Sequence, residues 1–298
     1  MALDERVRGK TAVLGLVGNP VEHSVSPQLH NTLSARLGTD TVYIPMRVDP
    51  DRLGDAVKGF KAAGFKGFNV TIPFKEEIIK YVDVLSEEVK ITGSANTVRI
   101  AEGRTCAYST DAEGFVRSFE KETGLQFKGK KVLILGAGGT ARALALKIAS
   151  RDAEGLAIVN RTAEKASDIA GMVRDHTRAG AEAFGTDKLD DGDFINGFDI
   201  IVNTTSLGMY PKTTESPLGG KVKLDPRQAV YDVIYNPART TLLKQAEAFG
   251  CKTVNGMGML FWQGILAYEL WMEIKIPGEI TDGLWRDFSE YNVRPSPK

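Results

Sequence analysis

A glycine-rich segment in the middle of the chain carries the clearest chemical signal. It reads Gly136-Ala137-Gly138-Gly139-Thr140-Ala141 and directly follows the apolar run Lys131 to Leu135. In the pattern Gly-x-Gly-x-x-Ala, the first glycine permits a tight turn, the second lets the backbone approach a pyrophosphate, and the small last residue allows close helix packing. Unpaired N–H groups at the start of the following helix favour an anion. Because a strand and a helix flank it, we interpret the segment as a dinucleotide-binding loop rather than a flexible turn.

The end of the next predicted strand indicates which dinucleotide is bound. An NAD-binding chain usually places Asp or Glu there to hold the ribose hydroxyls, but this sequence has Asn160-Arg161-Thr162. Arg161, with Thr162 and with Lys165 one turn into the helix, offers a positive site for a 2′-phosphate. Thr162 is also a good helix cap, and capping is compatible with phosphate binding. The sequence therefore favours NADP, with NAD less expected.

Three polar segments in the first third of the chain follow predicted strands. They are residues 19–27, 69–75 and 94–97. Ligands of open α/β sheets bind beyond the carboxyl ends of strands, where these segments lie. Each has a structural interpretation when taken singly, such as Ser26 as a helix cap and Lys75 as a solvated side chain. Together they supply hydroxyls, amides and one amine, which suit a small polyhydroxylated ligand.

Strands and helices alternate along the chain and position these segments. Predicted strands cover residues 11–17, 41–46, 68–72, 131–135, 156–160, 198–203 and 229–234. Predicted helices cover residues 26–37, 49–63, 111–121, 142–150, 162–178 and 240–249, and an apolar stretch at 257–274 predicts a buried helix. This alternation predicts parallel βαβ units and an α/β fold, with two α/β domains that meet near residues 111–121.

Composition excludes several classes of protein. The 298 residues include 38 Lys plus Arg and 38 Asp plus Glu, so no excess of positive charge supports nucleic-acid or membrane binding. Cys106 and Cys251 form no paired motif, and His23 and His30 lack an acidic ligand cluster, so we expect no metal site and a reducing, cytoplasmic location. Any anionic ligand must be met by charges placed locally.

Seven segments in register give the sequence a resemblance to the shikimate dehydrogenase family, from about Leu14 to Trp271. They are His23-Ser-x-Ser-Pro27, Asn69-Val-Thr-x-Pro-Phe-Lys75, Ala95-Asn-Thr97, Gly136-Ala-Gly-Gly139, Asn160-Arg-Thr162, Asn203-Thr-Thr-Ser-x-Gly-Met209, and Gly256-x-Gly-Met259 with Gln263. The resemblance implies NADPH-dependent reduction of 3-dehydroshikimate to shikimate, a step of aromatic amino acid biosynthesis. It also implies a catalytic domain of residues 1–111 and 256–298, a Rossmann-type NADP domain of residues 112–255, and a substrate cleft between them.

The resemblance also implies roles for individual residues. Lys75 and Asp111 match the catalytic positions, and a lysine ammonium near the carbonyl oxygen can stabilise developing negative charge and donate a proton. The positions that match substrate contacts are Ser24, Ser26, Thr71, Asn96, Tyr235 and Gln263. The positions that match cofactor contacts are Gly136, Ala137, Gly138, Gly139, Thr140, Ala141, Asn160, Arg161, Thr162, Lys165, Thr204, Thr205, Ser206, Met209, Gly256 and Met259. We expect a monomer or homodimer.

One segment departs from the family pattern. The family usually has Gly-x-Asn-Thr-Asp-Gly-x-Gly-Phe, whereas this chain has Ser109 in place of the amide and Ala112 in place of the second glycine; Asp111 is kept. The two changes bear on substrate choice, so quinate or an aminoshikimate stays an alternative substrate. A catalytically silent NADP-binding regulatory protein is the alternative from another class, although Lys75 and Asp111 speak against it.

Overall fold

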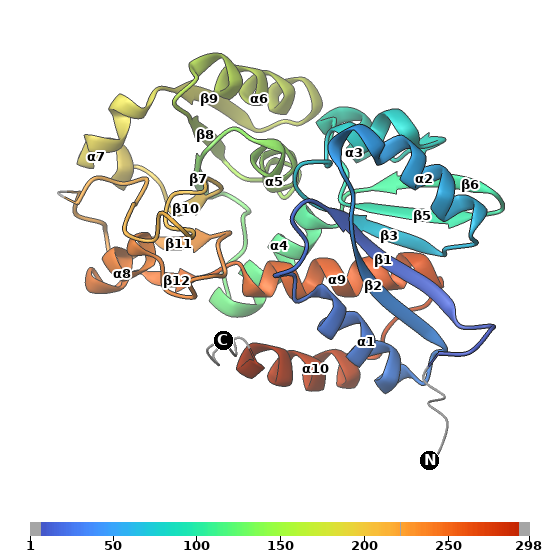
Figure 1. Ribbon diagram of the computed structural model, residues 1–298. Coiled ribbons are helices and arrows are strands. Elements are labelled where there is room, and N and C mark those ends of the chain that lie inside the picture. Colours follow the sequence, from blue (N-terminus) through green and yellow to red (C-terminus); the bar gives the residue numbers. More distant parts are fainter. Residues whose placement is uncertain (1–6, 221, 292–298) are drawn as a thin grey trace. The chain divides into compact units, whose positions relative to one another are not determined.

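A computed structural model describes residues 7–220 and 222–291 of the chain. These residues form two compact units (Figure 1). The first holds the chain up to Thr110 and again from Gln263 onward, and the second is Asp111–Trp262. Helix α9 (Met257–Met272) begins in the second unit and continues into the first. The chain therefore returns to its first unit seven residues later than the boundary expected at residue 256.

A six-stranded mixed sheet forms the first unit, in the order β2-β1-β3-β5-β6-β4. Its strands are β1 (Ala12–Gly18), β2 (Thr41–Arg47), β3 (Gly67–Val70), β4 (Val84–Leu85), β5 (Thr97–Ala101) and β6 (Arg104–Tyr108). Its helices are α1 (Ser26–Leu37), α2 (Leu53–Ala62), α3 (Glu87–Thr92), the part of α9 from Gln263 and α10 (Gly278–Tyr291), with 3-10 turns at η1 (Pro50–Arg52) and η2 (Glu77–Tyr81). The α/β prediction is confirmed.

The parallel βαβ units predicted for residues 11–72 are confirmed, but this sheet also contains strands β4, β5 and β6, which were not predicted. Strands β2, β1 and β3 are parallel, but β5 runs antiparallel to both β3 and β6. A turn of two residues, Glu102 and Gly103, joins β5 to β6, and so short a link permits only antiparallel pairing. Both turn residues have left-handed backbone angles, with φ of 50° and 70°. The sequence signal was the Gly103 turn after a run that contains the β-branched residues Thr97, Val98 and Ile100.

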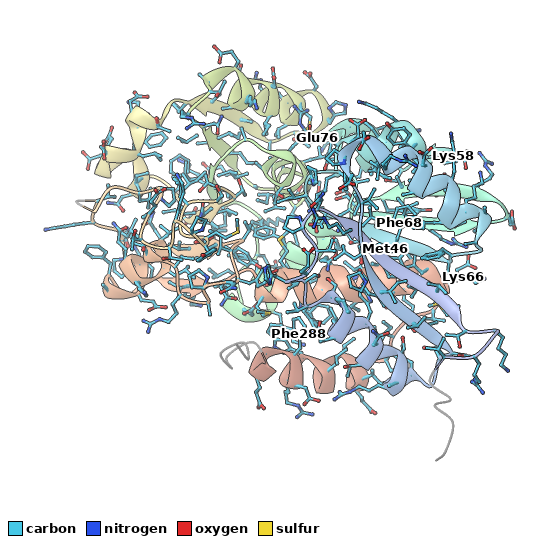
Figure 2. All side chains as sticks on the ribbon, in the orientation of Figure 1. Met46, Lys58, Lys66, Phe68, Glu76 and Phe288 are labelled. Atoms are coloured by element: carbon cyan, nitrogen blue, oxygen red, sulfur yellow. The ribbon has the colours of Figure 1, made fainter. Side chains whose placement is uncertain are left out.

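The core of the first unit lies around Phe68, whose side chain is fully buried (Figure 2). Met46 packs against the same cluster, and its methyl group lies over Gly15, where an added Cβ would be 2.3 Å from it. Helix α9 packs on the unit through Trp271, whose indole N–H donates to the Val98 carbonyl at 2.9 Å. Gly67 has no room for a side chain, because its Cβ would be 2.3 Å from the Trp271 ring. These close contacts attach the C-terminal part of α9 to the sheet of the first unit.

A six-stranded sheet of parallel strands forms the second unit, in the order β12-β11-β10-β7-β8-β9. Its strands are β7 (Lys131–Leu135), β8 (Gly155–Val159), β9 (Gly180–Phe184), β10 (Ile200–Asn203), β11 (Ala229–Asp232) and β12 (Lys252–Val254). Its helices are α4 (Asp111–Thr123), α5 (Gly139–Ala149), α6 (Ala163–His176), α7 (Gly192–Asn196), α8 (Thr241–Ala248) and the start of α9, with a 3-10 turn η3 (Thr186–Asp190). Helix α6 packs on β8 and β9, and α8 on β11 and β12. The strands of a parallel sheet with both faces covered are expected to be apolar, as β7 is from residue 132 to residue 135.

The apolar stretch predicted as a buried helix forms α9, which ends at Met272. Within residues 7–220 and 222–291, no helix has both the length and the apolar character that crossing a bilayer requires. Cys106 and Cys251 are both free thiols.

Candidate active site

The carboxyl ends of β1 and β3 bring two of the predicted polar segments together. The Thr71 N–H donates to the Val17 carbonyl at 2.9 Å, and the Asn19 N–H donates to the Ile72 carbonyl at 3.0 Å. Gly18 permits this approach, because a Cβ on it would lie 2.3 Å from the Thr71 methyl group. Parallel neighbouring strands end at the same edge of a sheet, which is where ligands of such folds bind.

Lys75 is fixed by its backbone at the same edge. Its neighbour Phe74 is 1% exposed and belongs to the core, and the Phe74 N–H closes a turn onto the Thr71 carbonyl at 2.9 Å. The Lys75 carbonyl accepts the Ala95 N–H at 2.8 Å, which joins Lys75 to the segment that contains Asn96. The half-buried Lys75 side chain therefore starts from a defined point in the first unit.

Asn96 is the centre of a buried polar network that reaches α9. Its Oδ1 accepts the Thr110 N–H at 2.7 Å, and its Nδ2 donates to the Thr110 hydroxyl at 2.9 Å and to Gln263 Oε1 at 3.3 Å. Both amides are almost fully buried. Because Gln263 uses its oxygen toward Asn96, its Nε2 group faces other partners as a donor.

Two residues beneath Asn96 were not predicted as site residues. Asn69 Nδ2 donates to the Asn96 carbonyl at 3.1 Å and to the Thr97 hydroxyl at 3.0 Å. The Tyr43 hydroxyl donates to Asn69 Oδ1 at 2.9 Å, and burial raises the pKa of Tyr43 well above its ordinary value. The sequence signal for Asn69 was its place in a polar segment, whereas nothing local marks Tyr43.

The segment that contains Ser24 and Ser26 differs from expectation in its cap. Val25 occupies the N-cap position of α1, and Ser26 is the first helical residue, so the interpretation of Ser26 as a cap is wrong. The Ser26 N–H instead donates to the Ser24 hydroxyl at 3.2 Å. Ser24 is half-buried and Ser26 is 6% exposed, and Thr71 is half-buried.

The histidines play structural or exposed roles in the described part of the chain. His30 is fully buried, its ring is stacked 4.2 Å from that of Tyr43, and desolvation lowers the pKa of His30 to about 3. His23 is exposed. Among the described residues, no group of three or more His, Cys, Asp or Glu side chains could hold a metal ion.

In the second unit, the glycine-rich loop has the shape that a pyrophosphate requires. Gly136 has a φ of 105°, and a Cβ on it would lie 2.6 Å from the Thr204 hydroxyl. Gly138 is the N-cap of α5, it has open space where a Cβ would be, and no side chain caps the helix. The first turn of α5 carries no acidic residue. The open approach and the uncapped helix start fit a dinucleotide phosphate.

The turn after β8 presents an exposed cation. Arg161 and Lys165 are exposed, and the structure records no ion pair for the Arg161 guanidinium within the described residues. Thr162 is the N-cap of α6, but its hydroxyl makes no capping hydrogen bond, while Asn160 Nδ2 closes the turn onto the Thr162 carbonyl at 2.9 Å. The hydroxyl and the guanidinium are thus both available to a phosphate.

The loop after β10, residues 204–209, lies directly beside the glycine-rich loop. The Thr204 N–H and hydroxyl both donate to the Leu135 carbonyl, at 2.8 and 2.7 Å. Thr205 is held by Asn203, whereas Ser206 and Met209 are exposed. We name residues 204–209 the β10 loop.

Four other predicted site residues also lie in the second unit. Asp111 is the first residue of α4 and is 8% exposed, and its neighbour Ala112 is accommodated in the helix without positive φ. Burial raises the pKa of Tyr235, which keeps its phenol a hydrogen-bond donor at neutral pH. Gly256 is packed so closely that a Cβ would lie 1.9 Å from the Val233 carbonyl oxygen, and Met259 is 8% exposed. Close packing thus explains why residue 256 is a glycine. The predicted contacts of Gly256 and Met259 with a cofactor remain predictions.

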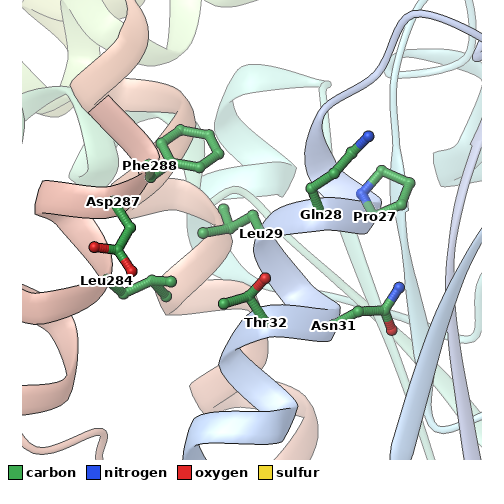
Figure 3. A pocket seen from close by; sticks show the side chains of 8 residues that line it. All are labelled: Pro27, Gln28, Leu29, Asn31, Thr32, Leu284, Asp287 and Phe288. Carbon is green, nitrogen blue, oxygen red and sulfur yellow. The ribbon is translucent and has the colours of Figure 1, made fainter. Parts of the chain in front are cut away.

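A groove of about 570 Å³ between α1 and α10 is a separate feature of the first unit (Figure 3). Its lining residues are Pro27, Gln28, Leu29, Asn31, Thr32, Leu284, Asp287 and Phe288. Asp287 is the one charged residue among them, and it forms an ion pair with Arg36. The groove therefore offers no positive charge to an anionic ligand.

Comparison with known proteins matches both units to one family. Residues 16–98 match the model described as "Shikimate dehydrogenase substrate binding domain", and residues 118–212 match "Shikimate / quinate 5-dehydrogenase". The shikimate dehydrogenase (NADP(+)) of Methanopyrus kandleri is 40% identical over 280 residues, which cover 94% of this chain and 97% of that protein. The chain belongs to the shikimate dehydrogenase family.

Solved structures of the family have the same fold over nearly the whole chain. The shikimate 5-dehydrogenase of Listeria monocytogenes, in complex with shikimate and NAD, has a TM-score of 0.87 and 35% identity, and the match covers 96% of this chain and 99% of that one. The shikimate 5-dehydrogenase of Thermus thermophilus, in complex with NADP(H) and shikimate, has a TM-score of 0.81 and 31% identity, with coverage of 93% and 99%. Members of the family thus bind either nicotinamide dinucleotide.

Proposed function

We propose that the chain is an NADP-dependent dehydrogenase that interconverts shikimate and 3-dehydroshikimate. The observation that carries the proposal is the edge of the first sheet, where Lys75 is tied through Ala95 to the network of Asn96 and Gln263. A primary amine among amides and hydroxyls suits a ring that bears hydroxyls and one ketone. The relatives named shikimate dehydrogenase (NADP(+)) support the choice of ring.

The reaction that we propose needs a positively charged group beside the carbonyl oxygen that can also donate a proton. A bound nicotinamide supplies the hydride. As hydride reaches the carbonyl carbon, negative charge develops on the oxygen, and the Lys75 ammonium stabilises this charge and donates its proton, so that C=O becomes CH–OH. General acid catalysis of this kind accelerates a reaction by about 10²–10⁴-fold. We assign Asp111 to the orientation of the ammonium, and in the reverse direction Lys75 accepts the hydroxyl proton.

Neutral groups recognise the substrate carboxylate in this proposal. Ser24 and Ser26 supply hydroxyls, and Tyr235 supplies a phenol that remains protonated because burial raises its pKa. Asn96, Gln263 and Thr71 contact the ring hydroxyls. A chain with no net charge can thus bind an anion by hydrogen bonds alone.

Cofactor choice rests on Arg161 in the same proposal. Its guanidinium is exposed and has no acidic partner among the described residues, and Asn160 stands where NAD-binding proteins carry an acid. We infer a preference for NADP, supported by relatives named for NADP, although the Listeria monocytogenes structure holds NAD. The substrate domain of residues 1–111 and 256–298 and the NADP domain of residues 112–255 also belong to the proposal, as do a cytoplasmic location and a monomeric or homodimeric state.

A second candidate is a dehydrogenase that prefers quinate or an aminoshikimate. It is favoured by Ser109 and Ala112, which differ from the usual family residues beside Asp111, and by the family description that names quinate. A silent NADP-binding protein is the remaining alternative.

A steady-state panel separates these proposals. Shikimate, quinate and an aminoshikimate are each oxidised at alkaline pH with NADP and with NAD. We expect the highest kcat/KM with shikimate and NADP. A higher kcat/KM with quinate than with shikimate would support the second candidate instead. NADP binding without turnover of any of the three acids would support a catalytically silent protein.

A further inference from the structure

A buried carboxylate outside the predicted site lies where two loops of the second unit begin. Asp232 is the last residue of β11 and has no exposed surface. Its oxygens accept three hydrogen bonds: Oδ1 from Asn203 Nδ2 at 3.0 Å and from the Ile234 N–H at 3.1 Å, and Oδ2 from the Thr240 hydroxyl at 2.7 Å. Each donor comes from a different position in the chain, and none of them carries a charge.

The first of these bonds determines the conformation of the β10 loop. A carboxylate can only accept, so it fixes which end of the Asn203 amide faces it. The Asn203 oxygen is therefore turned to Thr205, and it accepts the Thr205 N–H at 2.9 Å and the Thr205 hydroxyl at 2.7 Å. The Thr205 hydroxyl oxygen in turn accepts the Leu207 N–H at 3.2 Å. A chain of hydrogen bonds thus runs from Asp232 into the loop that lies beside Gly136.

The other two bonds determine the segment between β11 and α8, residues 233–240, which we name the β11 loop. Thr240 is fully buried and caps α8, because its hydroxyl oxygen accepts the Leu243 N–H at 3.3 Å while its proton goes to Asp232. Ile234 begins the same loop, and its carbonyl accepts the Gly256 N–H at 3.1 Å. Tyr235, the predicted substrate contact, is the next residue. Both ends of the β11 loop therefore depend on one carboxylate.

The two loops also meet directly. Gly208 of the β10 loop has a φ of 102°, and a Cβ on it would lie 3.3 Å from the Thr240 Cβ. Just beyond the two loops, the hydroxyl of Thr241 at the start of α8 donates to the Thr213 carbonyl at 3.1 Å. A shift of Thr240 would thus be transmitted to the β10 loop as well.

We propose that Asp232 is a positioning residue for the cofactor half of the site, and that its carboxylate holds the β10 and β11 loops in the conformation that binds NADP. This role rests on the cofactor binding proposed above. Asp232 itself touches neither ligand in the proposal. It acts through Asn203 and Thr205 on one loop and through Thr240 and Ile234 on the other.

The test is direct titration of NADP into three variants of the whole chain by calorimetry, which needs no turnover. In Asp232→Ala all three hydrogen bonds are lost, and we expect the Kd for NADP to rise at least tenfold. Asp232→Asn keeps an oxygen for Asn203 and Ile234 and can donate to the Thr240 oxygen, so we expect its Kd to stay within threefold of the unmodified chain. This rescue by the isosteric amide would show that geometry, rather than charge, is responsible.

Gln228→Ala is the matched control. Gln228 precedes the first residue of β11, is 3% exposed, and donates to the Ile195 and Phe198 carbonyls at 2.9 and 2.8 Å. Its loss also removes buried hydrogen bonds from the second unit, but at the opposite end of the strand. We expect a fall in Tm comparable with that of Asp232→Ala and an NADP Kd within twofold of the unmodified chain.

Several results would overturn the inference. One is NADP binding by Asp232→Ala that equals that of the unmodified chain, and another is equal weakening by Gln228→Ala, which would indicate general destabilisation. If Asp232→Ala does not fold, Asn203→Ala breaks the same chain of bonds to Thr205, and unchanged binding by that variant would overturn the inference too. Failure of the unmodified chain to bind NADP would instead refute the cofactor proposal itself, and the inference with it.

Discussion

The two units place their predicted chemistry at the carboxyl ends of strands, but they build that edge differently. In the second unit, the β7 and β8 ends are followed by segments whose roles were predicted from their own residue types and spacing, such as Gly136 to Ala141. In the first unit, Lys75, Asn96 and Gln263 come from three distant parts of the chain and meet through a hairpin and a returning helix. In the parallel sheet, each of these strands is followed by a loop at the same edge, so the segments can be recognised locally. In the mixed sheet, the site residues come together only through contacts between remote segments.

This difference shows which interactions hold the candidate site residues of each unit in place. The cofactor segments of the second unit depend on backbone geometry at Gly136 and Gly138, and on the support that Asp232 gives to two loops. The first unit depends on side-chain amides that are buried and use one another as partners. Substitutions of Asn96 or Gln263 should therefore change the kinetic constants for the substrate, and substitutions of Gly136 or Gly138 those for the cofactor.

The largest expected effect is a loss of turnover when Lys75 of the first unit is replaced. Lys75→Ala removes the proposed proton donor, so kcat for shikimate oxidation should fall by about 10²–10⁴-fold with a modest change in KM. Lys80→Ala is the control, because Lys80 lies five residues on, is exposed, and pairs with Glu77. Turnover by Lys75→Ala close to that of Lys80→Ala would remove Lys75 from the mechanism.

A second effect concerns the pH dependence of stability in the second unit. Burial raises the pKa of Asp232 to about 6, from 3.8. Between these values the folded chain keeps a proton that the unfolded chain has lost, so this group's contribution to stability is complete below pH 4 and is lost as the pH rises through 6. The loss is about 3 kcal/mol.

Asp232→Asn cannot titrate and tests this directly. The free energy of unfolding of the variant, taken relative to that of the unmodified chain, should increase by about 2–3 kcal/mol between pH 4 and pH 7, so the variant becomes comparatively more stable. Urea denaturation at the two pH values measures the difference. If the difference in the free energy of unfolding between the two proteins is the same at both pH values, the expectation is contradicted.

Cofactor selectivity gives a third and smaller effect. Arg161→Gln removes one charged hydrogen-bond donor to the 2′-phosphate, which should lower kcat/KM with NADP by about tenfold to a hundredfold and leave the value with NAD nearly unchanged. Arg178→Gln serves as the control, since Arg178 is exposed just beyond the other end of α6. Equal losses with both cofactors would show that Arg161 does not read the 2′-phosphate.

The smallest effect is expected at Tyr43 in the first unit. Tyr43→Phe removes the hydrogen bond to Asn69 and leaves the rest of the ring in place. We expect a loss of about 1 kcal/mol in the free energy of unfolding and a rise of a few-fold in KM for shikimate, with KM for NADP unchanged. A change confined to KM for NADP would contradict the assignment of substrate binding to the polar network of the first unit.

Local spacing predicted much of the fold and part of the candidate site. The helix at residues 26–37 was predicted with the bounds it has, and so was β7, because Pro27 at a helix start and the apolar run that ends at Leu135 are local signals. Lys75 and Arg161 could be named because each stands in a distinctive segment. Strands β5 and β6 were not predicted, although Glu102 and Gly103 signal a hairpin, so their antiparallel pairing was missed as well.

By itself, the sequence determined the α/β class, the dinucleotide loop and the cation at Arg161, since each depends on local segments, and seven short segments spread along the chain indicated the family. The tertiary structure alone decided that Gln263 partners Asn96, that Tyr43 supports Asn69, and that Asp232 joins two loops. These pairs are separated by up to 167 residues. A buried polar group must find a partner wherever the fold brings one, and the sequence around it does not say which partner that will be.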